Sequence, residues 1–180
     1  MKLVSLSDGY IEFLRSKCPN VMDNKINERK HTRKYLGVLF EINGYDYFAP
    51  LSSPKSYDVN ADGSFKKSNL FCSRIVMNDG GGKMHMYGKI MYKNMIPVPK
   101  CAIIDYKIAD ETDSKYKDVV INEYRWIQLH KGEIIYASNR IYRFKCDSRN
   151  QNDGRINAIV NFKDAEKICL LYSQFVKEVK

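Results

Sequence analysis

The sequence predicts an α+β fold in which an antiparallel sheet precedes most of the helices. Short runs rich in β-branched and aromatic residues fill much of the first 106 positions, and Asn43-Gly44 joins two of them. From Tyr116 onward, apolar residues recur at helical spacing instead. The regular strand–helix alternation of a parallel sheet is absent, so we expect helices around an antiparallel sheet or half-open barrel.

The N-terminal elements are predicted to be a strand and a helix. Residues 2–6 have strand character, and Ser7 or Asp8 is a suitable N-cap because its side-chain oxygen can accept a hydrogen bond from a backbone N–H. Helical spacing follows and ends near Cys18-Pro19. Residues 20–34 are polar and basic without periodicity, so they are predicted to form a loop.

A central hairpin gives the clearest local pattern. Residues 35–42 and 45–50 are both β-rich, and Asn43-Gly44 between them favours a type I′ turn because both turn positions need positive φ. Later elements are predicted as strands over 70–77, 84–91 and 101–106, a flexible turn at 79–82 and a break in the pattern at 95–99.

The C-terminal third is predicted to be mainly helical. One helix begins at Tyr116 and is ended by Gly132, and a second contains Ile134 to Phe144. Residues 146–155 are predicted as a polar loop, residues 156–160 as a short extended segment and residues 163–177 as the last helix. Because no repeat or long linker divides the chain, residues 1–180 are expected to form one domain.

Composition narrows the class of function. Thirty Lys and Arg against 21 Asp and Glu give a net charge of +9, which favours a polyanionic partner such as nucleic acid, although a lysine-rich proteome gives the same balance. The chain lacks a long apolar run, and Asp8 precedes any signal-peptide core, so a soluble, cytoplasmic protein without a membrane partner is expected. Five widely spaced cysteines predict reduced thiols and no zinc site.

The candidate chemistry lies where the hairpin ends. Ser52, Ser53 and Lys55 bring two hydroxyls and an ammonium within four positions, and such a group can bind a phosphate. An ordinary serine–proline turn with a solvated lysine is the alternative. Four tyrosines could stack on unpaired bases, although most tyrosines in a small domain pack at the edge of the core; they are Tyr57, Tyr87, Tyr92 and Tyr106.

The basic loop before the hairpin supplies further candidates. If the sheet curls, its side chains face the hydroxyls and the lysine across a groove; these basic residues are Arg29, Lys30, His31 and Arg33, with Lys34 adjoining them. A groove of this kind suits attack of an RNA 2′-OH on its own phosphate, which needs a base, an acid and cations but no metal ion. A solvated cationic surface is the alternative.

Several motifs stand in an order typical of one protein family. They are Tyr35-Leu36-Gly37-Val38, the Asn43-Gly44 hairpin, Tyr47-Phe48-Ala49-Pro50-Leu51-Ser52-Ser53-Pro54-Lys55, Asn94-Met95-Ile96-Pro97-Val98-Pro99, Tyr124-Arg125-Trp126-Ile127 and Asn161-Phe162. Together they resemble the ToxN/AbiQ toxins of bacterial type III toxin–antitoxin systems. The resemblance runs through most of the chain and is weak over 56–88 and 146–155.

The resemblance implies a compact, partly open antiparallel β-barrel with flanking helices, similar to MazF/Kid-type toxins. It also implies an endoribonuclease without metal or other cofactor, which leaves a 2′,3′-cyclic phosphate and a 5′-hydroxyl, often at adenine-rich sites. The expected partner is a repeated antitoxin RNA that the toxin processes into pseudoknots and with which it forms a closed ring. Cellular and phage RNA are the expected substrates, in abortive infection.

Carried over by position, the resemblance makes Ser53 the active-site serine and Lys55 the nearby cation, with Ser52 in a slot commonly Ser or Thr. Arg33 fits the basic position before the hairpin. The tyrosine that the family places there is absent from residues 20–34, so the general acid and base stay open among His31, Lys30 and Arg29.

Two other classes of function compete with a ribonuclease. A non-catalytic RNA-binding module would use the same basic groove to hold phosphates without cleaving them. A DNA-binding regulator would need a helix-turn-helix, which the sequence does not contain.

Overall fold

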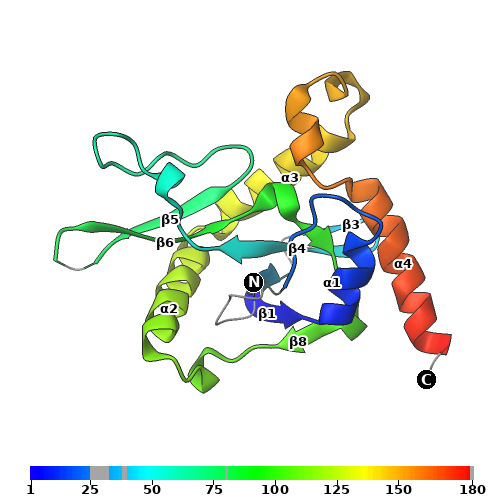
Figure 1. The fold of residues 1–180 in the computed structure, drawn as a ribbon, viewed down its shortest axis with the longest axis horizontal. Coiled ribbons are helices and arrows are strands. Elements are labelled where there is room, and N and C mark those ends of the chain that lie inside the picture. Colours follow the sequence, from blue (N-terminus) through cyan, green and yellow to red (C-terminus); the bar gives the residue numbers. More distant parts are fainter. Residues whose placement is uncertain (25–32, 38–39, 80, 179–180) are drawn as a thin grey trace.

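The fold is α+β, as predicted (Figure 1). It is seen in a computed structural model that describes residues 1–24, 33–37, 40–79 and 81–178. The strands are β1 (Lys2–Leu6), β2 (Tyr35–Gly37), β3 (Glu41–Ile42), β4 (Tyr45–Ser52), β5 (Ser73–Asn78), β6 (Met84–Ile90), β7 (Ile96–Pro97) and β8 (Ile103–Asp105). The α-helices in the described residues are α1 (Asp8–Arg15), α2 (Ser114–Leu129), α3 (Lys131–Cys146) and α4 (Phe162–Glu178).

The eight strands form one antiparallel sheet built around β4. The order along the sheet is β5-β6-β4-β2-β1-β8, and β3 and β7 pair with β4 as well. Within the described residues no pairing joins β5 to β8, so the sheet is not closed into a barrel. Tyr47 and Phe48 are neighbours on β4 whose side chains take opposite faces, and both are fully buried, so β4 is covered on its two sides.

The predicted hairpin turn is confirmed. Asn43 has φ 53° and Gly44 has φ 78°, so both turn residues take the left-handed conformation that Asn-Gly tolerates. The first hairpin strand is shorter than predicted, because β2 and β3 occupy separate parts of 35–42 and residues 38–39 lie outside the described residues. Both parts pair with β4.

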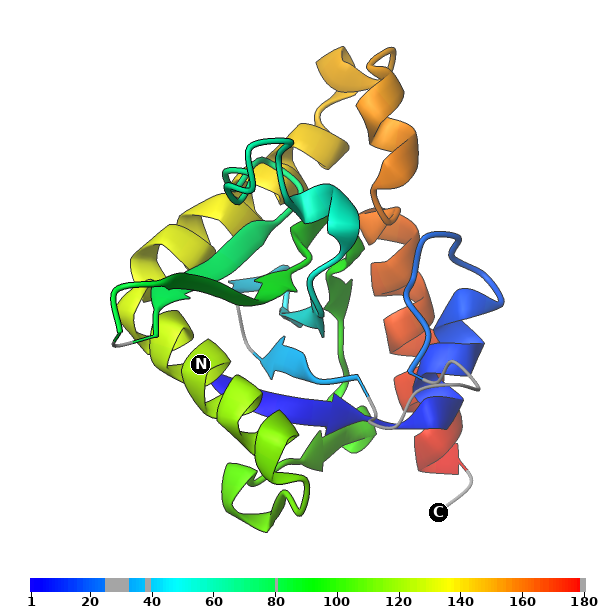
Figure 2. The ribbon, with the colours of Figure 1, turned by 60° about the vertical axis from the view of Figure 1, so that its left-hand side comes forward.

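The helices lie on two sides of the sheet (Figure 2). Helix α1 begins as predicted, with the Ser7 hydroxyl accepting the N–H of Tyr10, and it packs beside α4. Helices α2 and α3 run along the other side, where α2 contacts β5 and β6. None of the helices in the described ranges is long and apolar enough to cross a lipid bilayer.

Buried polar contacts fix β4 to the C-terminal helices. The Glu166 carboxylate on α4 accepts hydrogen bonds from the hydroxyls of Tyr47 (2.8 Å) and Tyr142 (2.7 Å). Its other oxygen accepts from Lys163 Nζ at 3.0 Å. Since hydrogen bonds to charged groups are stronger than neutral ones, this cluster holds β4 firmly upstream of the site.

Four predicted elements were wrong in detail. Gly132 does not end a helix: α2 ends at Leu129, His130 leaves helical geometry with φ −113° and ψ 23°, and Gly132 lies in the first turn of α3. The extended segment predicted over 156–160 is wrong at its start, because residues 154–158 form a 3₁₀-helix in which Asp153 accepts the N–H of Arg155. The predicted break at 95–99 contains β7. The last strand, predicted over 101–106, is shorter, because residues 100–102 form a 3₁₀-turn and β8 covers Ile103–Asp105.

Candidate active-site loop

The candidate site begins at the last residue of the central strand. Ser52 ends β4 and pairs with Lys89 on β6, so its backbone is part of the sheet. Ser53, Pro54 and Lys55 follow as an exposed turn, and residues 56–58 form a short 3₁₀-helix, η1 (Ser56–Asp58). The two serines and the lysine thus lie where the central strand ends, as predicted, and Ser53 and Lys55 are exposed.

A buried carboxylate holds this loop from below. Asp58 is fully buried, and its Oδ2 accepts hydrogen bonds from the backbone N–H of Lys55 (2.9 Å) and from Lys89 Nζ (2.6 Å). Its Oδ1 accepts from Arg74 Nε at 3.0 Å, and Arg74 Nη2 lies 2.9 Å away. Burial alone would raise the pKa of Asp58, but the hydrogen bonds from Lys89 and Lys55 hold it below its ordinary value.

We call Asp58, Arg74 and Lys89 the Asp58 cluster. Sequence analysis missed this cluster, because the register that aligns β5, β6 and the end of β4 cannot be read from the amino-acid sequence. The one available signal was Asp58 itself, an acid three residues after Lys55, which is the spacing at which a side chain can accept a backbone N–H.

Tyr57 has the exposure expected of a residue that stacks on a base. Its side chain is 63% exposed, and Lys89 Nζ lies 4.7 Å from the centre of its ring. A cation at this distance from an aromatic ring is attracted to the ring face. Tyr57 is therefore supported by Lys89 while most of its surface stays accessible.

The structure separates the two basic residues at the start of the hairpin. Arg33 is only 3% exposed, and it donates to the carbonyls of Asp23 (Nε, 2.9 Å) and Leu51 (Nη1, 2.9 Å). It thus lies beside the end of β4, as predicted, but as a buried residue bound to backbone and not as an open cation. Such contacts fit positioning of the strand end better than direct contact with a substrate.

Lys34 takes a different direction from Arg33, as successive side chains in extended backbone do. Its Nζ donates to Ser5 Oγ at 3.3 Å and lies 4.0 Å from the centre of the Tyr106 ring. Burial lowers the pKa of Lys34. The structure therefore does not bring Lys34 to the loop, and Arg29, Lys30 and His31 lie outside the described residues.

A buried acid lies behind the sheet near the loop. Glu123 on α2 is 6% exposed, and its carboxyl fills the space where a side chain on Gly88 would begin, close to the carbonyl of Ser52. Burial raises the pKa of Glu123 to about 8. Sequence analysis missed this residue because helical spacing marks position 123 as core-facing without indicating what it meets.

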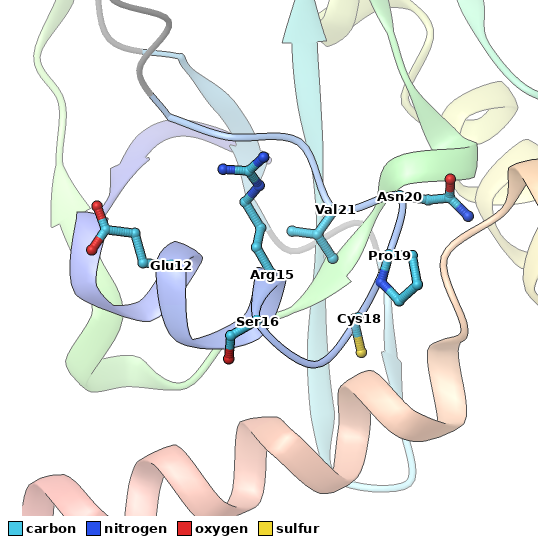
Figure 3. A pocket seen from close by; sticks show the side chains of 7 residues that line it. All are labelled: Glu12, Arg15, Ser16, Cys18, Pro19, Asn20 and Val21. Carbon is cyan, nitrogen blue, oxygen red and sulfur yellow. The ribbon is translucent and has the colours of Figure 1, made fainter.

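A hollow at the end of α1, within the described residues, lies apart from the predicted loop. It has a volume of about 380 Å³ and is lined by Glu12, Arg15, Ser16, Cys18, Pro19, Asn20 and Val21. Figure 3 shows the Cys18 side chain pointing toward α4, and burial raises the pKa of its thiol to about 11. Among the described residues, no three His, Cys, Asp or Glu side chains gather closely enough to hold a metal ion.

These features define a class: an α+β protein whose central strand ends in a loop with two serines and a lysine, above a buried cluster of one carboxylate and two cations. The family profile for "Toxin ToxN, type III toxin-antitoxin system" matches residues 2–169. The chain therefore belongs to the ToxN toxin family of type III toxin–antitoxin systems, which confirms the resemblance of the motifs.

Individual relatives agree with this assignment. The chain is 30% identical over 144 residues to the endoribonuclease ToxN of Bacillus thuringiensis subsp. kurstaki, a match that covers 79% of this chain and 67% of that protein. It is 25% identical over 177 residues to the endoribonuclease AbiQ of Lactococcus lactis subsp. lactis, covering 97% and 90%.

Solved structures share the fold. AbiQ, described as a lactococcal anti-phage endoribonuclease of a type III system, superposes with a TM-score of 0.78 at 24% identity and covers 96% of this chain and 98% of its own. A structure from a study of selective toxin inhibition by a non-coding RNA pseudoknot has a TM-score of 0.76 at 24% identity, with 96% and 97% covered.

Proposed function

We propose that this chain is an endoribonuclease, the toxin of a type III toxin–antitoxin system, and that it cleaves RNA at the Ser52–Lys55 loop. The observation that carries the proposal is the pair of serines beside Lys55 at the end of a buried strand, Ser52 half-buried and Ser53 exposed, in a member of the ToxN family. The names of the curated relatives, which are endoribonucleases, support the same activity.

The proposed reaction is transfer of a phosphate within the RNA, without a metal ion or cofactor. The substrate's 2′-oxygen bonds to the adjacent phosphorus, the bond from phosphorus to the 5′-oxygen breaks, and the products carry a 2′,3′-cyclic phosphate and a 5′-hydroxyl. One proton leaves the 2′-hydroxyl and one reaches the departing 5′-oxygen, so a base and an acid are required.

Each residue of the loop has a role that its chemistry allows. Lys55 neutralises the charge that builds on the phosphate oxygens, and Ser52 and Ser53 hydrogen-bond those oxygens or pass a proton. Arg33 acts indirectly: it donates a hydrogen bond to the Leu51 carbonyl and so positions the backbone just before the two serines. His31, Lys30 and Arg29 are the proposed proton-transfer residues and RNA contacts, with Tyr57 as the surface for base stacking.

The proposed partner is an antitoxin RNA made of repeated pseudoknots, which the toxin processes and binds in a closed protein–RNA ring. The +9 charge favours such a polyanion. A solved structure that shares this fold comes from work on toxin inhibition by an RNA pseudoknot. The proposed substrates are cellular and phage RNA in the bacterial cytoplasm. We also propose that the sheet is distantly similar to that of MazF/Kid-type toxins.

The test is cleavage of a transcript with several adenine-rich sites in the presence of EDTA, followed by analysis of the fragment ends. We expect defined fragments with 2′,3′-cyclic phosphates, lost in Lys55→Ala and retained in Lys167→Ala, a control at an exposed lysine on α4. If folded protein freed of copurified RNA binds the transcript without cleaving it, the endoribonuclease proposal is wrong and a non-catalytic RNA-binding module takes its place.

A further inference from the structure

The Asp58 cluster is a buried group of charges with an unequal balance. The side chains of Asp58, Lys89 and Arg74 are 0%, 2% and 8% exposed. One carboxylate therefore serves two cations, and the cluster carries a net positive charge where burial of charge is costly. A group of this kind is retained only where its geometry is well satisfied, and every oxygen of Asp58 is indeed hydrogen-bonded.

The strand register explains why the cluster sits under the loop. Ser52 on β4 pairs with Lys89 on β6, and Lys89 pairs with Arg74 on β5, so the three residues form a row across the sheet. Directly paired residues share one face, and two like charges in that position repel one another. A carboxylate must approach this face to offset the repulsion, and Asp58 arrives there from the loop that follows Ser52.

The same approach fixes the backbone of Lys55. Asp58 Oδ2 accepts the Lys55 N–H at 2.9 Å while it binds Lys89 Nζ at 2.6 Å, so one oxygen joins the loop to the sheet. Arg74 also holds the returning chain, because its Nη1 donates to the Lys67 carbonyl at 2.6 Å. The Lys55 side chain stays exposed above this anchored backbone.

We propose that Asp58, Arg74 and Lys89 are positioning residues for RNA cleavage, and that they hold Lys55 and Tyr57 in place through the N–H of Lys55 and the ring of Tyr57. The inference rests on the proposed function only in assigning cleavage to Lys55. According to this proposal, the buried charges contribute to the rate of cleavage. The alternative is that they contribute only to the stability of the fold.

Two variants separate positioning from stability. Asp58→Asn removes the only negative charge of the cluster and leaves two buried cations together, so it is expected to lower both the melting temperature and the rate of cleavage. Asp58→Asn with Lys89→Met removes one charge of each sign and restores the original net charge. We expect this double variant to melt close to the wild-type temperature and still to lose cleavage.

The measurements are single-turnover cleavage of a defined RNA and hydrogen exchange of the Lys55 amide in protein labelled with ¹⁵N-lysine. We expect the double variant to cleave about tenfold or more slowly, with the RNA concentration for half-maximal rate within about twofold of wild type, because misplaced groups cost rate more than binding. Its Lys55 amide is expected to exchange faster. Asp147→Asn is the control, since Asp147 also accepts a backbone N–H and an arginine but lies between α3 and α4.

The proposal is overturned if the double variant recovers its rate together with its melting temperature, or if the Lys55 amide stays protected without Asp58. An equal loss of rate in Asp147→Asn would also overturn it. Failure of the proposed function looks different: wild-type protein would not cleave RNA at all, while protection of the Lys55 amide would still depend on Asp58.

Discussion

At the scale of single residues, the two hydroxyls of the loop are not equivalent in their surroundings. Ser52 belongs to the sheet, whereas Ser53 is exposed beside Lys55. Ser53→Ala is expected to reduce cleavage about a hundredfold or more without unfolding the protein, because an exposed hydroxyl contributes little to stability but a contact to a developing charge contributes much.

The check on Ser53 is the rate of RNA cleavage together with a thermal melt. Ser56→Ala is the matched control, since Ser56 is an exposed serine of the same segment. A similar loss in both variants would show that the loop is merely sensitive to change, and full activity of Ser53→Ala would remove Ser53 from the site.

Glu123 gives the molecule a pH dependence with a definite sign. Burial raises its pKa from 4.5 to about 8, so the folded protein holds this proton more tightly than the unfolded chain. The contribution of Glu123 to stability is therefore greatest at acidic pH and is lost as the pH rises from about 4.5 to 8. Glu123→Gln cannot ionise, so this loss should be absent from the variant.

The measurement is urea unfolding at several pH values between 5 and 8. Relative to wild type, Glu123→Gln should gain about 2–4 kcal/mol of unfolding free energy across that range, as a shift of this size requires. Glu12→Gln on α1 serves as a control for a general loss of negative charge. Parallel curves for wild type and Glu123→Gln would contradict the assignment.

The residues that the sequence predicted are those whose chemistry is visible locally. Ser52, Ser53 and Lys55 are neighbours in the chain, so their grouping needs no knowledge of the fold. Arg74 and Lys89 become partners of Asp58 only through strand register, and Arg33 was predicted in the right place but not as a buried residue. Whether a side chain is buried depends on which strands pair over long distances in the chain, and this pairing cannot be read from a single sequence.

At the scale of elements, two glycines illustrate opposite constraints. Any side chain on Gly88 of β6 would collide with the Glu123 carboxyl, so α2 packs on the sheet only because this position is bare. Gly88→Ala is expected to destabilise the protein by about 1–3 kcal/mol through overpacking. In Gly132→Ala on α3, the added methyl group has no atom within 4 Å. This variant should stabilise the protein by about 0.5–1 kcal/mol, because alanine favours a helix more than glycine does.

Chemical denaturation of the two alanine variants checks this pair. An additional Glu123→Ala change should relieve much of the Gly88→Ala effect, since it removes the group that the new methyl meets. Equal effects of the two alanine substitutions, in size and sign, would mean that α2 does not lie against β6 as described.

Element boundaries were predictable where local signals decide them. The N-cap predicted at Ser7 or Asp8 is Ser7, and the Asn43-Gly44 turn is confirmed; both depend on adjacent residues. The extended segment predicted over 156–160 was wrong over 156–158, because the apolar residues there are typical of a strand, whereas the Asp153 cap stabilises a 3₁₀-helix over 154–158. Gly132 is typical of a helix end, but helix α2 ends at Leu129 with His130 as its C-cap.

At the scale of the whole molecule, the positive charge predicts how RNA binding responds to salt. If the +9 charge reflects contacts with phosphates, binding of the antitoxin RNA should weaken about a thousandfold between 50 and 200 mM salt for about six contacts. Fluorescence anisotropy with a labelled pseudoknot repeat measures this. A nearly flat dependence, or equal affinity for duplex DNA of the same length, would contradict an RNA-binding surface built on charge.

The residues of the Asp58 cluster are far apart in the sequence, so they are synthesised at different times. Asp58 precedes Arg74 by 16 positions and Lys89 by 31. During synthesis the serines and Lys55 therefore leave the ribosome well before the strands that anchor their loop. A chain interrupted before β6 contains the two serines and Lys55 but lacks Lys89. On the roles proposed above, we therefore expect the toxin to become active only after translation has passed Lys89.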